Sequence, residues 1–206
     1  MKKRIAQFSA FIILGAFIIT ACSPVRMTTW VNPKEHLKTS KVVVLALFDK
    51  MDYVRSFEQT VASYLNSNGM VAVEANTLLN PVKQHSREEM KSKFDSIGAD
   101  AVLLVTYTGT DKKESYVQTA NPMYPDYYYN YYSFYTWGYP MVSTGYWTTT
   151  TVVNLRANLY HTSNADLLWS GTLKLTNPKD VESISQYIAT AVLADWQKNM
   201  LINDKK

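Results

Sequence analysis

Residues 42–48 read VVVLALF, and residues 101–107 read AVLLVTY. Both are short, continuous apolar runs rich in β-branched residues, which is typical of strands buried on both faces of a sheet. Between them lie a third apolar run, MVAVEA at 70–75, and two stretches in which apolar residues recur at helical spacing. Strand, helix, strand, helix, strand in this order predicts an α/β layer structure.

The helical spacing of three and four residues predicts helices at Val54–Asn68, Arg87–Ile97 and Lys179–Leu201. Ser86 and Glu89 form a capping box at the start of the second helix. Pro178 is expected at the first position of the third helix, where the missing N–H of proline costs nothing.

Two further stretches, 147–159 and 167–175, alternate apolar and polar residues, which predicts half-buried antiparallel strands. Trp169 and Trp196 lie on the apolar faces of their elements, so we expect both to be buried. The sequence therefore predicts one α/β (α+β) domain, in which a mixed sheet in the order βαβα-ββ-α is covered by helices and closed by a C-terminal helix.

The N-terminus reads MKKRIAQFSAFIILGAFIITAC. Its basic start and 14-residue apolar run are too short for a membrane-spanning helix, which needs about 20 residues, and favour a signal peptide at 1–21. Ile19-Thr20-Ala21-Cys22 resembles a bacterial lipobox, which implies cleavage before Cys22 and lipidation of that residue. The alternative is an ordinary signal peptide followed by a free or buried cysteine. We expect a lipoprotein, with residues 22–40 as a polar tether and residues 41–206 as a single domain.

Charge and sorting signals place the mature protein in the envelope. Without Lys2, Lys3 and Arg4, 18 basic side chains remain against 17 acidic ones, so the body is nearly neutral and nucleic-acid binding is not expected. Ser23 follows the cysteine where, by resemblance to lipoprotein sorting in two-membraned bacteria, an Asp would favour the inner membrane. We expect a lipid anchor in the outer membrane, facing the periplasm.

Residues 124–140 read YPDYYYNYYSFYTWGYP and hold eight of the 15 tyrosines in the chain. Prolines and glycines punctuate the surrounding segment 121–145, so we expect an exposed insertion between two neighbouring strands. Either its rings pack on the sheet, or they form a contact surface for an envelope protein, a glycan or another copy of the chain. A pore-forming hairpin is not expected, because the segment lacks alternation of apolar and polar residues. The candidate contact residues are Tyr124, Tyr127, Tyr128, Tyr129, Tyr131, Tyr132, Tyr135, Trp137 and Tyr139.

Motifs for catalysis and metal binding are not found in the sequence. His36, His85 and His161 have no second ligand at metal-binding spacing, and the sequence has no GxSxG, HExxH or P-loop pattern. We therefore expect no catalytic residues, no metal and no cofactor, and a non-catalytic binding or assembly role. An envelope hydrolase acting on glycan or peptide is the alternative, because active sites assemble in space. Oligomeric state is left open.

The segments TTWVNP, KVVVLALF, FEQTVASYLNSNG, SIGADAVLLVTY and NADLLWSGTLKLTNP, in this order and spacing, resemble a family of small bacterial lipoproteins of unknown function. Members of that family often carry a Tyr-, Gly- and Pro-rich insertion before the LxWSG hairpin. More distantly, the arrangement resembles the periplasmic domains of the curli-secretion lipoprotein and of penicillin-binding-protein activators. The resemblance implies a non-enzymatic role and supplies no catalytic residues.

Overall fold

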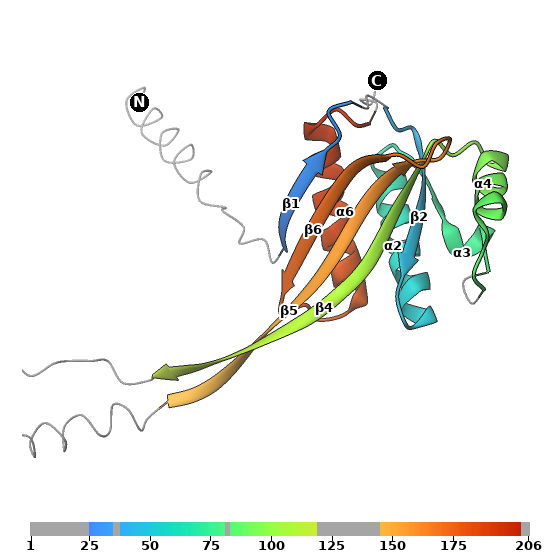
Figure 1. The fold of residues 1–206 in the computed structure, drawn as a ribbon. Coiled ribbons are helices and arrows are strands. Elements are labelled where there is room, and N and C mark those ends of the chain that lie inside the picture. The colour runs from blue at the N-terminus through green and yellow to red at the C-terminus, as the bar shows by residue number, and fades with distance from the viewer. Residues whose placement is uncertain (1–24, 35–37, 81–82, 119–144, 203–206) are drawn as a thin grey trace, which may run out of the picture.

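The computed structural model describes residues 25–34, 38–80, 83–118 and 145–202. Six strands form one sheet in the order β1-β6-β5-β4-β2-β3 (Figure 1). The strands are β1 Val25–Val31, β2 Lys41–Leu47, β3 Val71–Glu74, β4 Ala101–Gln118, β5 Gly145–His161 and β6 Leu167–Thr176. The described helices are α2 Met51–Ser67, α3 Ala75–Leu78, α4 Arg87–Ser96 and α6 Val181–Lys198. The predicted α/β class is confirmed.

The sheet is mixed, as expected from the two kinds of strand pattern. β2 pairs in parallel with both β3 and β4, and β4, β5, β6 and β1 follow as antiparallel neighbours. The continuous apolar runs therefore form the parallel half, where both faces are covered. The alternating stretches form the antiparallel half, where one face is covered.

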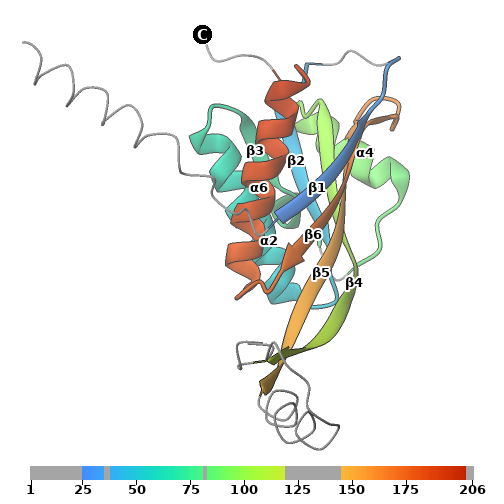
Figure 2. The same ribbon diagram turned by 90° about the vertical axis from the view of Figure 1, so that its left-hand side faces the viewer.

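Helices α2 and α6 lie side by side on one face of the sheet, and α3 and α4 lie on the other face beside β2 (Figure 2). Val42, Val44 and Leu103 point into the larger core under α2 and α6, whereas Val43 and Val102 point into the smaller core under α3 and α4. The expected burial of both tryptophans is confirmed, since Trp169 and Trp196 are each 0% exposed. Their rings pack edge to face with centroids 5.9 Å apart.

The helix signals in the sequence are confirmed with one correction. Ser86 caps α4 as predicted, because its hydroxyl accepts from the Glu89 backbone N–H at 3.1 Å. The expected proline start of α6 is wrong, since Asp180 is the N-cap and Pro178 precedes it. The Asp180 carboxylate accepts from the backbone and hydroxyl of Ser183, and those bonds supply a stronger start than proline at the first position.

The predicted tether at 22–40 needs a correction, because its residues 25–31 form the edge strand β1 on β6. Val25, Met27 and Val31 turn toward the core, and Trp30 is half exposed on the opposite face. The sequence predicted a linker because residues 22–40 are mostly polar, with one apolar island at Thr29–Val31. The sheet therefore includes residues from Val25 on, and not only those from Lys41 on.

Candidate functional site

The most distinctive feature of the fold is an arm formed by Lys112–Gln118 of β4 and Gly145–Thr151 of β5, paired in register from Lys112↔Thr151 to Gln118↔Gly145. β2 pairs with β4 only as far as Thr106, and β6 pairs with β5 only as far as Val152. The arm is therefore a two-stranded ribbon that projects beyond the helices and the other strands (Figures 1 and 2).

Asn177 follows the last residue of β6 and marks the point at which the arm begins. Its backbone N–H donates to the Thr151 carbonyl at 2.7 Å, and its side-chain oxygen accepts from the Thr151 N–H at 2.8 Å. Asn177 has φ 48, a left-handed conformation that asparagine tolerates better than most residues. With both polar groups of Thr151 satisfied, β6 stops at the root of the arm and β5 continues without a neighbour on that side.

A bulge at the root redirects β4. The register with β5 shifts between Tyr107 and Gly109, and Gly109 has φ 141, which an L side chain rarely adopts. A bulge increases the local twist and bends the strand that carries it. Beyond it, the Asn154 side-chain amide donates to the Asp111 carboxylate at 2.8 Å and ties the two strands together.

The outer end of the arm is aromatic and exposed. Tyr116 pairs directly with Trp147, and their ring centroids are 5.3 Å apart at an interplanar angle of 58°. Trp147 is 70% exposed and Tyr146 is 56% exposed, while Tyr116 and Val117 are 37% and 36% exposed. Large apolar side chains in a ribbon that no described helix or strand covers are suited to contact another surface.

An apolar pocket of about 300 Å³ lies at the root of the arm, between the sheet and the first turns of α2 and α6. Phe48, Phe57 and Tyr107 form much of its wall, with Asp49 and Lys50 among its polar lining residues. Its mainly apolar lining suits a small apolar group.

A second cavity, of about 450 Å³, lies beside α3 and is lined by Glu58, Asn76 and His85, among others. Glu58 is fully buried, and its burial raises the pKa of the carboxyl group. One carboxylate oxygen accepts from the Ala46 N–H at 2.9 Å, and the other accepts from the backbone and side-chain amides of Asn76 at 2.7 and 2.8 Å. Three donors fasten α2 to β2 and α3, so the geometry assigns Glu58 a structural role.

His85 lines the same cavity, and both of its ring nitrogens contact other residues of the chain. Its Nδ1 lies 2.9 Å from a Glu89 carboxylate oxygen, and its Nε2 lies 2.9 Å from the Asn80 carbonyl. The bond from His85 lowers the pKa of Glu89. These contacts hold the loop that precedes α4, and Glu89 binds His85 where the sequence predicted the return bond of a capping box.

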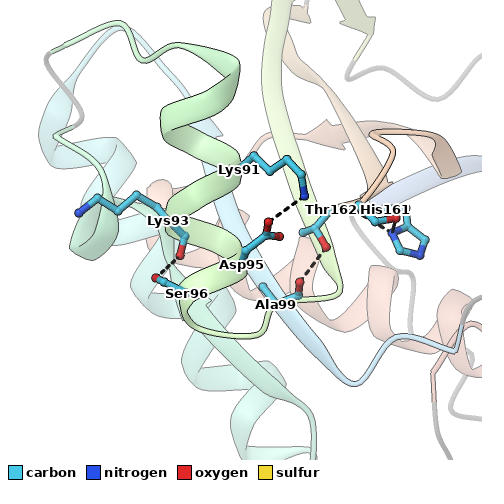
Figure 3. Close-up of polar contacts among 8 residues, drawn as sticks. Lys91, Lys93, Asp95, Ser96, Ala99, His161 and Thr162 are labelled. Atoms are coloured by element: carbon cyan, nitrogen blue, oxygen red, sulfur yellow. Dashed lines mark hydrogen bonds and ion pairs between the residues drawn. The ribbon is translucent and has the colours of Figure 1, made fainter.

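The end of the sheet opposite the arm is closed by polar contacts (Figure 3). In the β5–β6 turn, the Thr162 hydroxyl donates to the Ala99 carbonyl at 2.7 Å, and His161 Nδ1 accepts from the Ser163 N–H at 3.1 Å. On α4, Lys91 pairs with Asp95 at 2.8 Å. A pocket of about 380 Å³ between α4 and this turn has a mainly apolar wall that includes Leu45, Phe94 and Tyr160.

The sequence-predicted site residues fall outside the described residues. Cys22 lies before β1, and the nine contact residues, Tyr124, Tyr127, Tyr128, Tyr129, Tyr131, Tyr132, Tyr135, Trp137 and Tyr139, lie between the two strands of the arm. The expectation that these strands are neighbours is confirmed. The predicted insertion 121–145 runs one residue into β5, since Gly145 belongs to that strand.

Four exposed residues flank the Tyr-rich segment but were not predicted as contact residues: Tyr116, Val117, Tyr146 and Trp147. Among the described residues, no group of three or more His, Cys, Asp or Glu side chains is placed to hold a metal ion. None of the helices described has the length and apolar character needed to cross a bilayer.

No protein-family model matches the chain, and no curated protein sequence matches it. Solved structures with a distant likeness include the PelC dodecamer from Paraburkholderia phytofirmans, which is 15% identical, with a TM-score of 0.46 and coverage of 87% of this chain and 99% of that one. Lipoprotein GNA1162 from Neisseria meningitidis is 14% identical, with a TM-score of 0.38 and coverage of 77% and 99%.

A PDZ domain protein from Parabacteroides distasonis is 8% identical, with a TM-score of 0.35, and the match covers 84% of this chain and 35% of that one. The matches to PelC and to lipoprotein GNA1162 each cover nearly the full length of that protein. Similarities at this level of identity and TM-score assign neither a family nor a role to this chain.

Proposed function

We propose that this protein is a non-catalytic binding or assembly factor of the cell envelope, held on the periplasmic side of the outer membrane by lipid on Cys22. The observation that carries the proposal is the two-stranded arm with its exposed aromatic end. Tyr146 and Trp147 of the arm are each more than half exposed, and an isolated two-stranded ribbon is marginally stable in water. Contact with another surface would cover these side chains and stabilise the ribbon.

The Tyr-rich segment belongs to the same contact element, because it joins the two strands at the outer end of the arm. Tyr side chains combine a large apolar face with few rotatable bonds and a hydroxyl that keeps the surface wettable. An envelope protein, a glycan strand or another copy of the chain would each suit such a surface. Nucleic acid would not, because residues 115–155 contain neither Lys nor Arg.

The alternative is an envelope hydrolase, and one that cleaves glycans by the usual pair of carboxyl groups would need a carboxyl group free to exchange a proton with substrate. Among the described residues, Glu58 combines a raised pKa with a place in a cavity wall. Its two oxygens already accept three N–H donors, so neither is oriented toward a substrate. This arrangement favours the non-catalytic role.

Cross-linking in native membranes tests the proposal. We expect wild-type protein to form discrete cross-linked complexes, and we expect the double variant Tyr116→Ser, Trp147→Ser to lose them. Tyr187→Ser is the matched control, because Tyr187 is 41% exposed but lies on α6, near Asn177 at the root of the arm rather than at its aromatic end. Complexes that persist in the arm variant, or that disappear equally in the control, would contradict a contact role for the arm.

A further inference from the structure

The arm leaves the sheet at the same end at which the chain enters β1. Val25, the first residue of β1, pairs with Leu175, and Leu175 pairs with Val153 of β5. Because β1 and β5 are both antiparallel to β6, they run in the same direction. β1 therefore begins at the end of the sheet from which the arm projects (Figure 1).

The two segments reach different distances. Cys22 precedes Val25 by three residues, which span at most about 10 Å when extended. β5 continues for eight residues from Val153 out to Gly145, about 25 Å at the rise of a strand. The distance from Cys22 to the start of β1 is thus shorter than the arm. An arm that points toward the membrane would therefore reach it.

The side chains along the arm are ordered by polarity. Nearest the body is a charged band, Lys112, Lys113 and Glu114, opposite Thr149–Thr151. Farther out come Tyr116 and Val117 opposite Trp147 and Tyr146, and the residues 115–118 and 145–148 carry no charge. Trp and Tyr are enriched at the boundary between bilayer and water, where their amphipathic rings suit the headgroup layer.

The greatest distance between Cys22 and Val25 can be compared with the point on the arm at which charged residues give way to uncharged ones. Three strand residues beyond Val153, equal to the span from Cys22 to Val25, bring β5 to Thr150, beside Lys113. The Tyr116–Trp147 pair lies three residues farther out, about 10 Å deeper, which is the depth at which apolar side chains meet the boundary of headgroups and acyl chains.

We propose that the aromatic end of the arm, Tyr116, Val117, Tyr146 and Trp147, lies in the headgroup layer of the membrane that carries the lipid on Cys22. The inference rests on the anchor in the proposed function and narrows that proposal, because it assigns the membrane, in place of a protein or a glycan, as the surface that these four side chains contact. Two contacts, lipid at one edge of the sheet and rings at the end of the arm, set the orientation of the domain on the membrane.

Fluorescence quenching on vesicles tests this arrangement. Lipidated protein is reconstituted in vesicles of phosphatidylethanolamine and phosphatidylglycerol, with or without nitroxide-bearing lipid. Since Cys22 is the only cysteine in the chain and carries lipid, Tyr146→Cys supplies one thiol for an environment-sensitive fluorophore. Asn164→Cys, exposed in the β5–β6 turn at the opposite end of the sheet, is the matched control.

We expect the nitroxide lipid to remove most of the fluorescence of the label at 146 and little at 164, and aqueous iodide to show the opposite order. If the protein floats with the vesicles but both labels are quenched by iodide alone, the arm lies in water, and the inference is overturned while the anchor stands. If the lipid-processed protein does not float, both the anchor and the membrane contact of the arm are wrong.

Discussion

The rings of Tyr116 and Trp147 pack against each other across the arm, and Gly145 gives the Tyr116 ring its place. A Cβ at position 145 would lie 2.5 Å from Cζ of Tyr116. The tyrosine therefore lies over Gly145 on one side and against Trp147 on the other. This aromatic cluster is built on the end of the ribbon, outside both hydrophobic cores.

Removing the aromatic cluster should leave the domain folded. For Tyr116→Ser with Trp147→Ser we expect the free energy of unfolding to change by about 0.5 kcal/mol or less, as for surface substitutions away from the core. Chemical denaturation followed by circular dichroism measures it. Trp169→Phe, in the core, should lower the stability clearly under the same conditions. A large loss in the arm variant would mean that the arm supports the fold.

Gly171 faces the fully buried ring of Trp169. A Cβ there would lie 2.5 Å from Cη2 of Trp169, whose indole N–H donates to the Asp195 carboxylate at 2.7 Å and so resists displacement. We expect Gly171→Ala to destabilise the protein by about 1–3 kcal/mol through overpacking. Thr172→Ala, exposed on the same strand, controls for the change in strand residue.

Adding Trp169→Phe to Gly171→Ala should then cost less than the sum of the two single changes, because the smaller ring makes room for the methyl group. Strict additivity in this double-mutant cycle would contradict the steric account. The measurement is equilibrium denaturation of the four chains.

Glu58 gives a pH-dependent prediction. Burial raises its pKa above the ordinary value of 4.5, so the folded state holds the proton more tightly than the unfolded state. The stability from this proton is present below pH 4.5 and is lost as the pH rises through the folded-state pKa. We expect Glu58→Gln to be destabilised at pH 7 by about 1–3 kcal/mol, because its amide must face an N–H donor.

The difference in unfolding free energy between wild type and Glu58→Gln should be largest below pH 4.5 and should shrink as the pH rises. Denaturation curves between pH 4 and pH 8, buffered at constant ionic strength, measure it. Glu88→Gln, exposed in the first turn of α4, controls for the loss of one carboxylate. A difference that grows with pH would mean that the three donors outweigh burial.

The lipid anchor predicts a simple change of compartment. Cys22→Ala removes the thiol that the lipobox presents for lipidation, and stable membrane attachment needs more than one acyl chain. We expect the variant in the soluble periplasmic fraction after cell lysis without detergent, and wild type in the outer-membrane fraction. A variant that stays in the membrane fraction would show that Cys22 is not the main attachment.

Most elements with a buried face were predictable from the sequence, with β1 and α3 as exceptions, and the outer part of the arm was not. The runs at 42–48 and 101–107, and the helical stripes of α2 and α6, follow from hydrophobic burial. The outer part of β4, TDKKESYVQ, has no buried side and hence no alternation of apolar and polar residues, so the length of the arm was not foreseen.

Composition also misled the sequence interpretation. β1 lies in a mostly polar stretch that predicts a tether, and only its pairing with β6 shows that Val25–Val31 belongs to the sheet. Asn177 marks the root of the arm through two hydrogen bonds to Thr151, which lies 26 residues earlier in the chain. A contact between residues so far apart leaves no local pattern in the sequence. The contact surface was placed on the Tyr-rich segment, and the structure adds the aromatic residues that flank it.

The central claim is that a stable α/β body supports a contact element that the body does not need for folding. Replacing Pro122–Ser143 with a short Gly/Ser linker, in the lipidated protein, tests it most directly. The deletion variant and wild type are compared for melting temperature and for cross-linked complexes in native membranes. We predict an unchanged melting temperature and loss of the complexes. A variant that unfolds, or that keeps the complexes of wild type, would contradict the account.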